Sequence, residues 1–129
     1  MKWAWLSALL LSACASFSNY ESSEITMQEM QAVAVDASAL MAEKYPAGKT
    51  SLAMNERLGN FGEIFKEQLR QKGFALADDG FKLHYTLDVL DTDFVRLGLL
   101  MHDWRADIRY QRTDNSIKRL NLTQRLSYE

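Results

Sequence analysis

Two segments in the first half of the chain have the three- and four-residue spacing of apolar positions that is typical of helices. The first runs over residues 27–45, where Thr26 and Glu29 form a capping box and Pro46 disfavours helical geometry at the residue before it. Its apolar positions are Met27, Met30, Val33, Ala34, Ala37, Leu40, Met41 and Tyr45. This methionine-rich stripe is either core or an adaptable binding surface.

The second helical segment begins near Asn60, where Glu63 repeats the capping-box spacing. Gly73 stands where a left-handed C-cap is expected. The apolar residues of this segment form one face and are Phe61, Ile64, Phe65 and Leu69. Short apolar runs at 50–54 and 74–77 predict a brief strand before and after this helix.

The remainder of the chain alternates apolar and polar residues, which predicts half-buried strands. One strand is expected over residues 81–89, between turn signals at 78–80 and 91–93. Residues 94–111 are either one bent strand or two, with the break at Gly98 or at residues 102–103. A turn at 113–116 then leads to a last strand with Leu120, Leu122 and Leu126 on one face.

The order of these elements is helix, strand, helix, strand and then a meander of antiparallel strands. It predicts an α+β fold with two helices packed on one face of a small mixed or antiparallel sheet. We expect residues 25–129 to form a single domain, since no repeat or internal boundary interrupts the pattern.

The first 14 residues combine a charged start, a short apolar run and small residues before a cut, which is typical of a secretory signal peptide. Lys2 precedes the apolar run 3–11, and Ser12 and Ala13 lead to Cys14, the single cysteine of the chain. This resembles the lipobox of bacterial lipoproteins. The resemblance implies cleavage between Ala13 and Cys14, an S-diacylglycerol and N-palmitoyl group on Cys14, and a membrane anchor of several acyl chains. The alternative is an ordinary signal peptide in which Cys14 is an unmodified small residue.

Residue 15 is Ala rather than Asp. In lipoproteins of enteric-type bacteria an Asp there favours the inner membrane, so the resemblance implies the periplasmic face of the outer membrane. Residues 14–24 are polar and serine-rich, which predicts a lipidated N-terminus and a flexible tether. The same segment is alternatively a docking peptide, with Phe17 and Tyr20 as its anchors.

Charge and cysteine content exclude several classes of function. Removal of residues 1–13 leaves 116 residues with 14 basic and 17 acidic side chains, a formal charge of −3. That balance argues against direct nucleic-acid binding. With Cys14 acylated no thiol remains for a disulfide, so the fold rests on its apolar core.

No residue pattern in the chain indicates catalysis, a metal site or a cofactor. His84 and His102 are the two histidines, and neither has a metal-ligand spacing. On a strand, His102 and Asp103 would point to opposite faces and would not form a dyad. A periplasmic hydrolase or inhibitor is a third reading of the chain, which a ligand-sized cleft lined by His84 or His102 would favour.

Arginines cluster near the end of the chain and are candidates for partner binding. If the last two strands pair, they would form a basic stripe of Arg105, Arg109, Arg112, Arg119 and Arg125. The alternative is a solvated sheet face on which nearby aspartates balance these charges. The last strand is also a candidate edge strand that could add to a neighbour's sheet.

Three further motifs lie in the first half of the domain: Ala37-Ser38-Ala39-Leu40, the turn from Lys44 to Thr50 with its Tyr-Pro-x-Gly pattern, and Lys72-Gly73-Phe74-Ala75. Together they resemble the TrbH family of conjugal transfer lipoproteins. The resemblance continues in residues 83–88 and 94–99, which resemble the family's strand pair.

The TrbH resemblance implies a non-catalytic scaffold of a conjugative type IV secretion system, which transfers plasmid DNA. It further implies contacts with subunits of the channel core complex and several copies in a ring. The alternative is a pilotin-like or envelope-biogenesis lipoprotein that escorts or stabilises one outer-membrane client.

Overall fold

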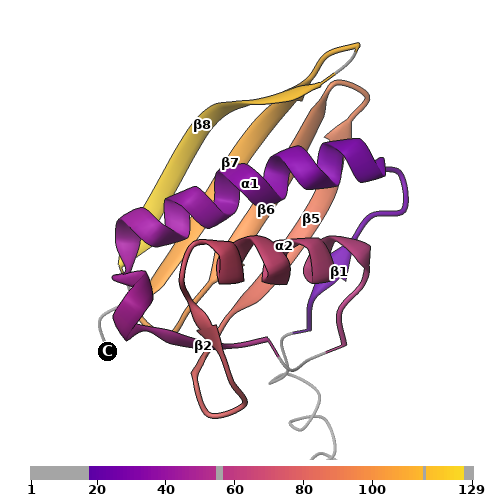
Figure 1. Ribbon diagram of the computed structural model, residues 1–129. Helices are drawn as coiled ribbons and strands as arrows, with labels where there is room; N and C mark the ends of the chain where they lie inside the picture. Colours follow the sequence, from indigo (N-terminus) through magenta and orange to yellow (C-terminus); the bar gives the residue numbers. More distant parts are fainter. Residues whose placement is uncertain (1–17, 55–56, 115, 127–129) are drawn as a thin grey trace, which may run out of the picture.

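The computed structural model describes residues 18–54, 57–114 and 116–126. Within these ranges, two α-helices lie on one face of a five-stranded sheet, and a small three-stranded parallel sheet flanks them (Figure 1). The elements are β1 Tyr20–Glu21, α1 Met27–Lys44, a 3-10 turn Ala47–Lys49, β2 Ser51–Ala53, α2 Asn60–Gln71, β3 Ala75–Leu76, β4 Phe81–Lys82, β5 His84–Asp91, β6 Phe94–Leu100, β7 Trp104–Arg112 and β8 Ile117–Leu126. The predicted α+β class and the helices on one face are confirmed.

The large sheet has the order β1-β5-β6-β7-β8. β5 to β8 form an antiparallel meander, and β1 adds to β5 in parallel. Residues 94–111 therefore form two strands, and the break lies at residues 101–103 rather than at Gly98. The backbone N–H of Met101 donates to the carbonyl of Trp104 over 2.8 Å and closes this turn.

The alternating run 81–89 is divided between the two sheets, so the prediction of one strand was wrong. Phe81 and Lys82 pair with β2 in the small sheet, and β5 begins at His84 in the large one. The N–H of Leu83 still donates to the carbonyl of Ala53, so the chain changes sheets directly after it. Alternation reports which face a side chain occupies and carries no information on which sheet the backbone joins.

α1 begins and ends as its sequence predicts. The Thr26 hydroxyl accepts from the Glu29 N–H, and the Glu29 carboxylate accepts from the Thr26 N–H, both at 3.1 Å. Tyr45, before Pro46, has extended backbone angles and ends the helix. The apolar stripe is core, except for Met27, which is 56% exposed, and Tyr45, which is partly buried against the core.

α2 ends as predicted, but the capping box expected for its start was wrong. Gly73 has φ 104° and its N–H donates to Arg70, while the Phe74 N–H donates to Leu69, which makes a Schellman motif. At the other end Gly59 is the N-cap and no side chain of the helix caps it. Glu21 of β1 does so instead, accepting from the N–H groups of Phe61 and Gly62 at 2.9 Å each.

A single core fills the space between the helices and the inner face of the large sheet. Trp104, Tyr85 and Tyr110 are its largest side chains, and each is at most 2% exposed. Inward residues alternate with outward ones along β6 and β7, so each strand is half-buried. The helices cover the inner face alone, and no helix or strand of the described residues covers the outer face (Figure 1).

A β-bulge interrupts the last strand pair. The register places Arg109 opposite Asn121 and Tyr110 opposite Arg119, so Leu120 has no partner on β7. This extra residue turns Arg119 to the inner face, away from Arg125. The prediction that Arg119 and Arg125 share one polar face was therefore wrong. Leu120 and Leu126 are 47% and 46% exposed, so the expected apolar face of β8 is only partly covered.

Candidate functional site

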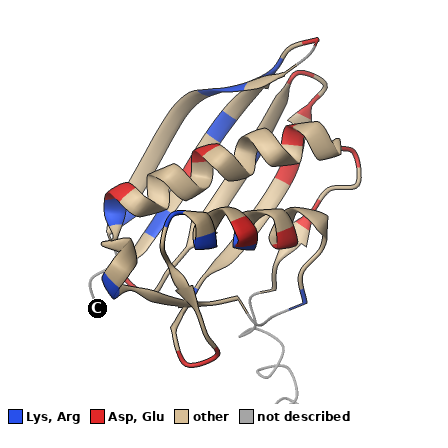
Figure 2. Cartoon of the chain, viewed as in Figure 1, with Lys and Arg blue, Asp and Glu red and all other residues tan. Residues whose placement is uncertain are grey.

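The outer face of the large sheet carries a group of four arginines, which we call the arginine surface: Arg96, Arg105, Arg109 and Arg125. The strand neighbours of Arg96, Arg105 and Arg109 are buried, which places these three arginines outward. Arg125 lies directly opposite Arg105 and therefore shares its face. Basic residues recur along β7 and β8, while several acidic residues lie on the two helices (Figure 2). The chain is acidic overall, yet this face carries four arginines together with Asp88 and Asp107.

Two pairs of these arginines lie directly opposite each other on neighbouring strands. Arg105 faces Arg125 between β7 and β8, and Arg96 faces Arg109 between β6 and β7. Like charges in that position destabilise a sheet. Asp107 offsets part of the charge through an ion pair with Arg96 at 3.3 Å. Within the described ranges, Arg105, Arg109 and Arg125 have no acidic partner.

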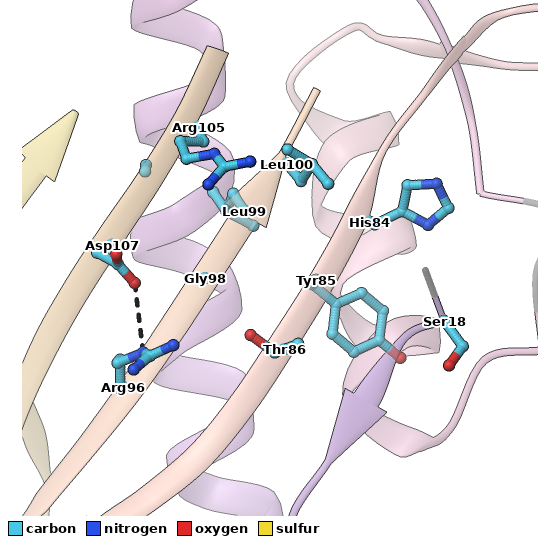
Figure 3. A pocket seen from close by; sticks show the side chains of 11 residues that line it. Ser18, His84, Tyr85, Thr86, Arg96, Gly98, Leu99, Leu100, Arg105 and Asp107 are labelled. Atoms are coloured by element: carbon cyan, nitrogen blue, oxygen red, sulfur yellow. Dashed lines mark ion pairs between the residues drawn. The ribbon is translucent and has the colours of Figure 1, made fainter. Parts of the chain in front are cut away.

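A shallow depression of about 280 Å³ lies beside the arginine surface. Gly98 lines it, and a Cβ at this position would lie 2.8 Å from Oγ1 of Thr86. Arg96 and Arg105 approach it from one side and His84 from the other (Figure 3). It is open to solvent and has no enclosed chamber for a small substrate.

Two arginines of the predicted basic stripe point instead to α1. Arg119 lies 3.2 Å from Oδ1 of Asp36, and Oδ2 of the same carboxylate accepts a hydrogen bond from the hydroxyl of Tyr110 at 2.8 Å. Arg112 lies opposite Ile117 at the end of β7 and contacts Glu29. The stripe of five arginines was therefore wrong, and Arg105, Arg109 and Arg125 are its members that lie together on the outer face.

The contact between Arg112 and Glu29 joins the large sheet to the start of α1. The guanidinium donates to both carboxylate oxygens, at 3.0 and 2.9 Å, and to the carbonyl of Glu24 at 2.7 Å. Both side chains are less than one-fifth exposed. The hydrogen bonds from Arg112 lower the pKa of Glu29, and those to Glu29 raise the pKa of Arg112. This ion pair has a structural role.

The sequence pattern of the conjugal transfer protein TrbH matches residues 12–123 of this chain. The match runs from two residues before Cys14 to residue 123, within β8. The chain belongs to the TrbH family. It is accordingly a conjugal transfer protein, in agreement with the resemblance found in its sequence. Neither a curated protein nor a solved structure matches this chain.

The segment that leads into this TrbH domain is not a free tether from residue 18 onward. The N–H of Ser22 donates to the carbonyl of Leu87 at 2.9 Å, and the side-chain oxygen of Asn19 accepts the N–H of Tyr85 at 3.0 Å. The described part of this segment therefore pairs with the edge of β5, and the predicted domain start at residue 25 stays a prediction. Tyr20, a predicted partner-binding residue, is 52% exposed.

Cys14, Ala13 and Phe17 lie outside the described residues, so lipidation, cleavage and a docking role for Phe17 stay predictions. No helix within the described ranges is long and apolar enough to cross a membrane.

The two histidines of the TrbH chain lie in different surroundings. His84 lines the depression, and His102 lies in the turn between β6 and β7, stacked on Phe81. Nε2 of His102 is 3.7 Å from Asp103, whose other oxygen accepts the Tyr45 hydroxyl at 2.6 Å. The expectation of opposite faces assumed a strand, which does not exist there. Among the described residues, no group of three acidic, His or Cys side chains could hold a metal ion.

Sequence reasoning missed three residues that shape these sites. Glu21 was assigned to the tether, yet it caps α2. Arg96 was read only as a strand residue and Gly98 only as a possible strand break, although both lie on the outer face beside Arg105. The alternation of apolar and polar residues along β6 predicts that Arg96 points outward. Its position opposite Arg109, however, depends on the register between β6 and β7.

Proposed function

We propose that this TrbH protein is an outer-membrane lipoprotein that serves as a non-catalytic structural component of a conjugative type IV secretion system. Membership of a conjugal transfer family carries the proposal. The small-residue sequence ending at Cys14, after a short apolar run, supports the lipid anchor. Ala15 supports retention at the outer membrane, by the sorting pattern of related lipoproteins.

The position of β1 supports a domain held close to the membrane. Asn19 is the fifth residue after Cys14, and it already bonds to Tyr85 of the sheet. Five residues span at most about 18 Å even when fully extended. A lipid on Cys14 would thus hold the folded domain near the bilayer surface, where it can contact other membrane-bound subunits.

The arginine surface supports a role in protein contacts rather than in chemistry. A broad, open and positively charged sheet face suits a docking surface for subunits of the channel core complex, in several copies. The depression lined by His84 is shallow and open, and a hydrolase would need an enclosed site with a placed nucleophile and base.

The first experiment measures plasmid transfer from donor cells that carry Cys14→Ser. We expect the protein to fold but to leave the outer-membrane fraction, and transfer to fall strongly. Ser16→Ala is the matched control, a small polar change beside the lipidation site that should leave both unchanged. Full transfer by the Cys14→Ser protein in donors would refute the lipoprotein scaffold.

The second experiment identifies what accompanies the lipidated protein, purified through a C-terminal tag from detergent-solubilised donor envelopes. Recovery of several channel subunits in a large complex would support the scaffold. Recovery of one outer-membrane client alone would favour the pilotin-like alternative.

A further inference from the structure

The outer edge of β8 is the second surface that no described element of the chain covers. β8 is the last strand of the large sheet and, with ten residues, the longest strand in the described part of the chain. Its other edge pairs with β7 along nearly its full length. An edge of this length presents a row of backbone N–H and carbonyl groups that can accept a further strand.

The side chains of β8 are also largely uncovered. Ile117 is its one buried residue and Leu122 is half-buried, while the other eight are exposed. Leu120 and Leu126 are each nearly half exposed. A strand added beside β8 would extend the sheet and cover part of this apolar area.

The charge of β8 determines which strands can pair with it. Lys118, Arg119 and Arg125 are its charged residues, and it contains no acid. A second copy of β8 would bring six positive charges together, which opposes self-pairing. Arg125 additionally faces Arg105 of β7, a repulsive pair that an incoming carboxylate would relieve.

We infer that the edge of β8 binds an extended acidic segment of a partner protein by strand addition. Its carboxylates would lie on the outer face beside Arg125, with Arg105 one strand further in, and the alternate apolar side chains on the inner face beside Leu122 and Leu126. Hydrogen bonds between the backbones hold the added strand, and the positive charge of β8 favours an acidic partner. The inference goes beyond the proposed function, because it depends on neither the lipid nor the secretion system.

The test uses the full-length protein, purified from envelopes in non-ionic detergent, and a synthetic peptide. The peptide alternates Glu and Val over about ten residues, to match the length of β8. Binding is measured by titration and by hydrogen exchange of the backbone amides. We expect the peptide to slow exchange in β8, and a matched peptide with Lys in place of Glu not to bind. Raising the salt concentration should weaken binding.

Arg125→Glu separates binding from folding. It converts the repulsive pair with Arg105 into an attractive one, so the melting temperature should rise by about 2–4 °C. The same change should weaken binding of the acidic peptide by at least about tenfold. Arg70→Glu, which reverses an exposed arginine on α2, is the matched control and should leave peptide affinity unchanged.

Three outcomes would overturn the inference. The first is that neither peptide slows exchange in β8. The second is that Arg125→Glu and the wild type bind the acidic peptide equally. The third is that the protein alone forms a dimer with β8 protected, since a second copy would then be the occupant. None of these depends on Cys14 or on plasmid transfer, so failure here leaves the proposed function standing.

Discussion

The hydroxyl of Tyr85 donates a 2.5 Å hydrogen bond to the carboxylate of Glu21 and so joins β5 to the first strand of the domain. The same carboxylate accepts two N–H groups at the start of α2. One acidic side chain therefore fixes β1, β5 and α2 relative to one another. Burial raises the pKa of Tyr85, and the bond to Glu21 raises it further.

Glu21→Ala should lower the free energy of unfolding by about 2–4 kcal/mol, because it leaves two helix N–H groups and a buried hydroxyl without their acceptor. Urea denaturation followed by circular dichroism measures the change. Glu63→Gln, in the exposed first turn of α2, is the control and should cost little. A Glu21→Ala protein as stable as the control would contradict the capping role.

Gly62→Ala should destabilise the protein, although alanine favours helix by about 1 kcal/mol. A Cβ at Gly62 would meet the hydroxyl of Tyr85 and lie 2.9 Å from Cβ of Leu58. Gly48→Ala is the control, because no atom lies within 4 Å of its Cβ position. Thermal melts of both variants should show a lower melting temperature for Gly62→Ala alone, and equal melting temperatures would disprove the close approach.

The contact between Glu29 and Arg112 should make stability depend on acidic pH. Because the pKa of Glu29 is lowered from 4.5 in the folded state, its contribution is fully present above pH 4.5. It is lost as the pH falls through the folded-state pKa. Arg112→Ala should cost about 2 kcal/mol at neutral pH and remove most of this dependence. Denaturation at a series of pH values measures the loss of stability at neutral pH and its dependence on pH. If Arg112→Ala and the wild type lost stability equally as the pH falls, the contact with Glu29 would not be the cause.

Tyrosine ionisation should destabilise the protein in alkali. Burial raises the pKa of Tyr45, Tyr85 and Tyr110 above 10.0, and nearby carboxylates reinforce each shift. Their contribution is therefore full below pH 10 and is lost as the pH rises through the folded-state values. Tyr110→Phe should reduce this loss and cost about 1 kcal/mol at neutral pH by removing the bond to Asp36. The absorbance of tyrosinate, measured against pH, follows the ionisation. If all three tyrosines ionised near pH 10 in the folded protein, their pKa values would not be raised and the prediction would be wrong.

Local patterns predicted the elements whose determinants lie close together in the chain. The capping box of Thr26 and Glu29, the stop at Pro46 and the C-cap at Gly73 each act over a few residues, and each was confirmed. The family could also be recognised from the sequence alone, because its motifs are short and contiguous. The α+β class followed from the order of the elements.

Features that depend on strand register or on contacts between distant residues could not be predicted from local sequence patterns. The cap of α2 comes from Glu21, some forty residues away in the chain, so no local pattern near Asn60 reveals it. The bulge at Leu120 turns Arg119 inward through a shift of one residue, and only the pairing of β8 with β7 determines where that shift falls.

The sequence by itself determined the two helices, the fold class, the family and the pattern from which a lipid anchor is proposed, because each is encoded over short spans. The tertiary structure decided which arginines share the outer face, which ones pair with α1, and that β8 is a free edge. Those outcomes depend on strand order and register, in which residues far apart in the chain become neighbours.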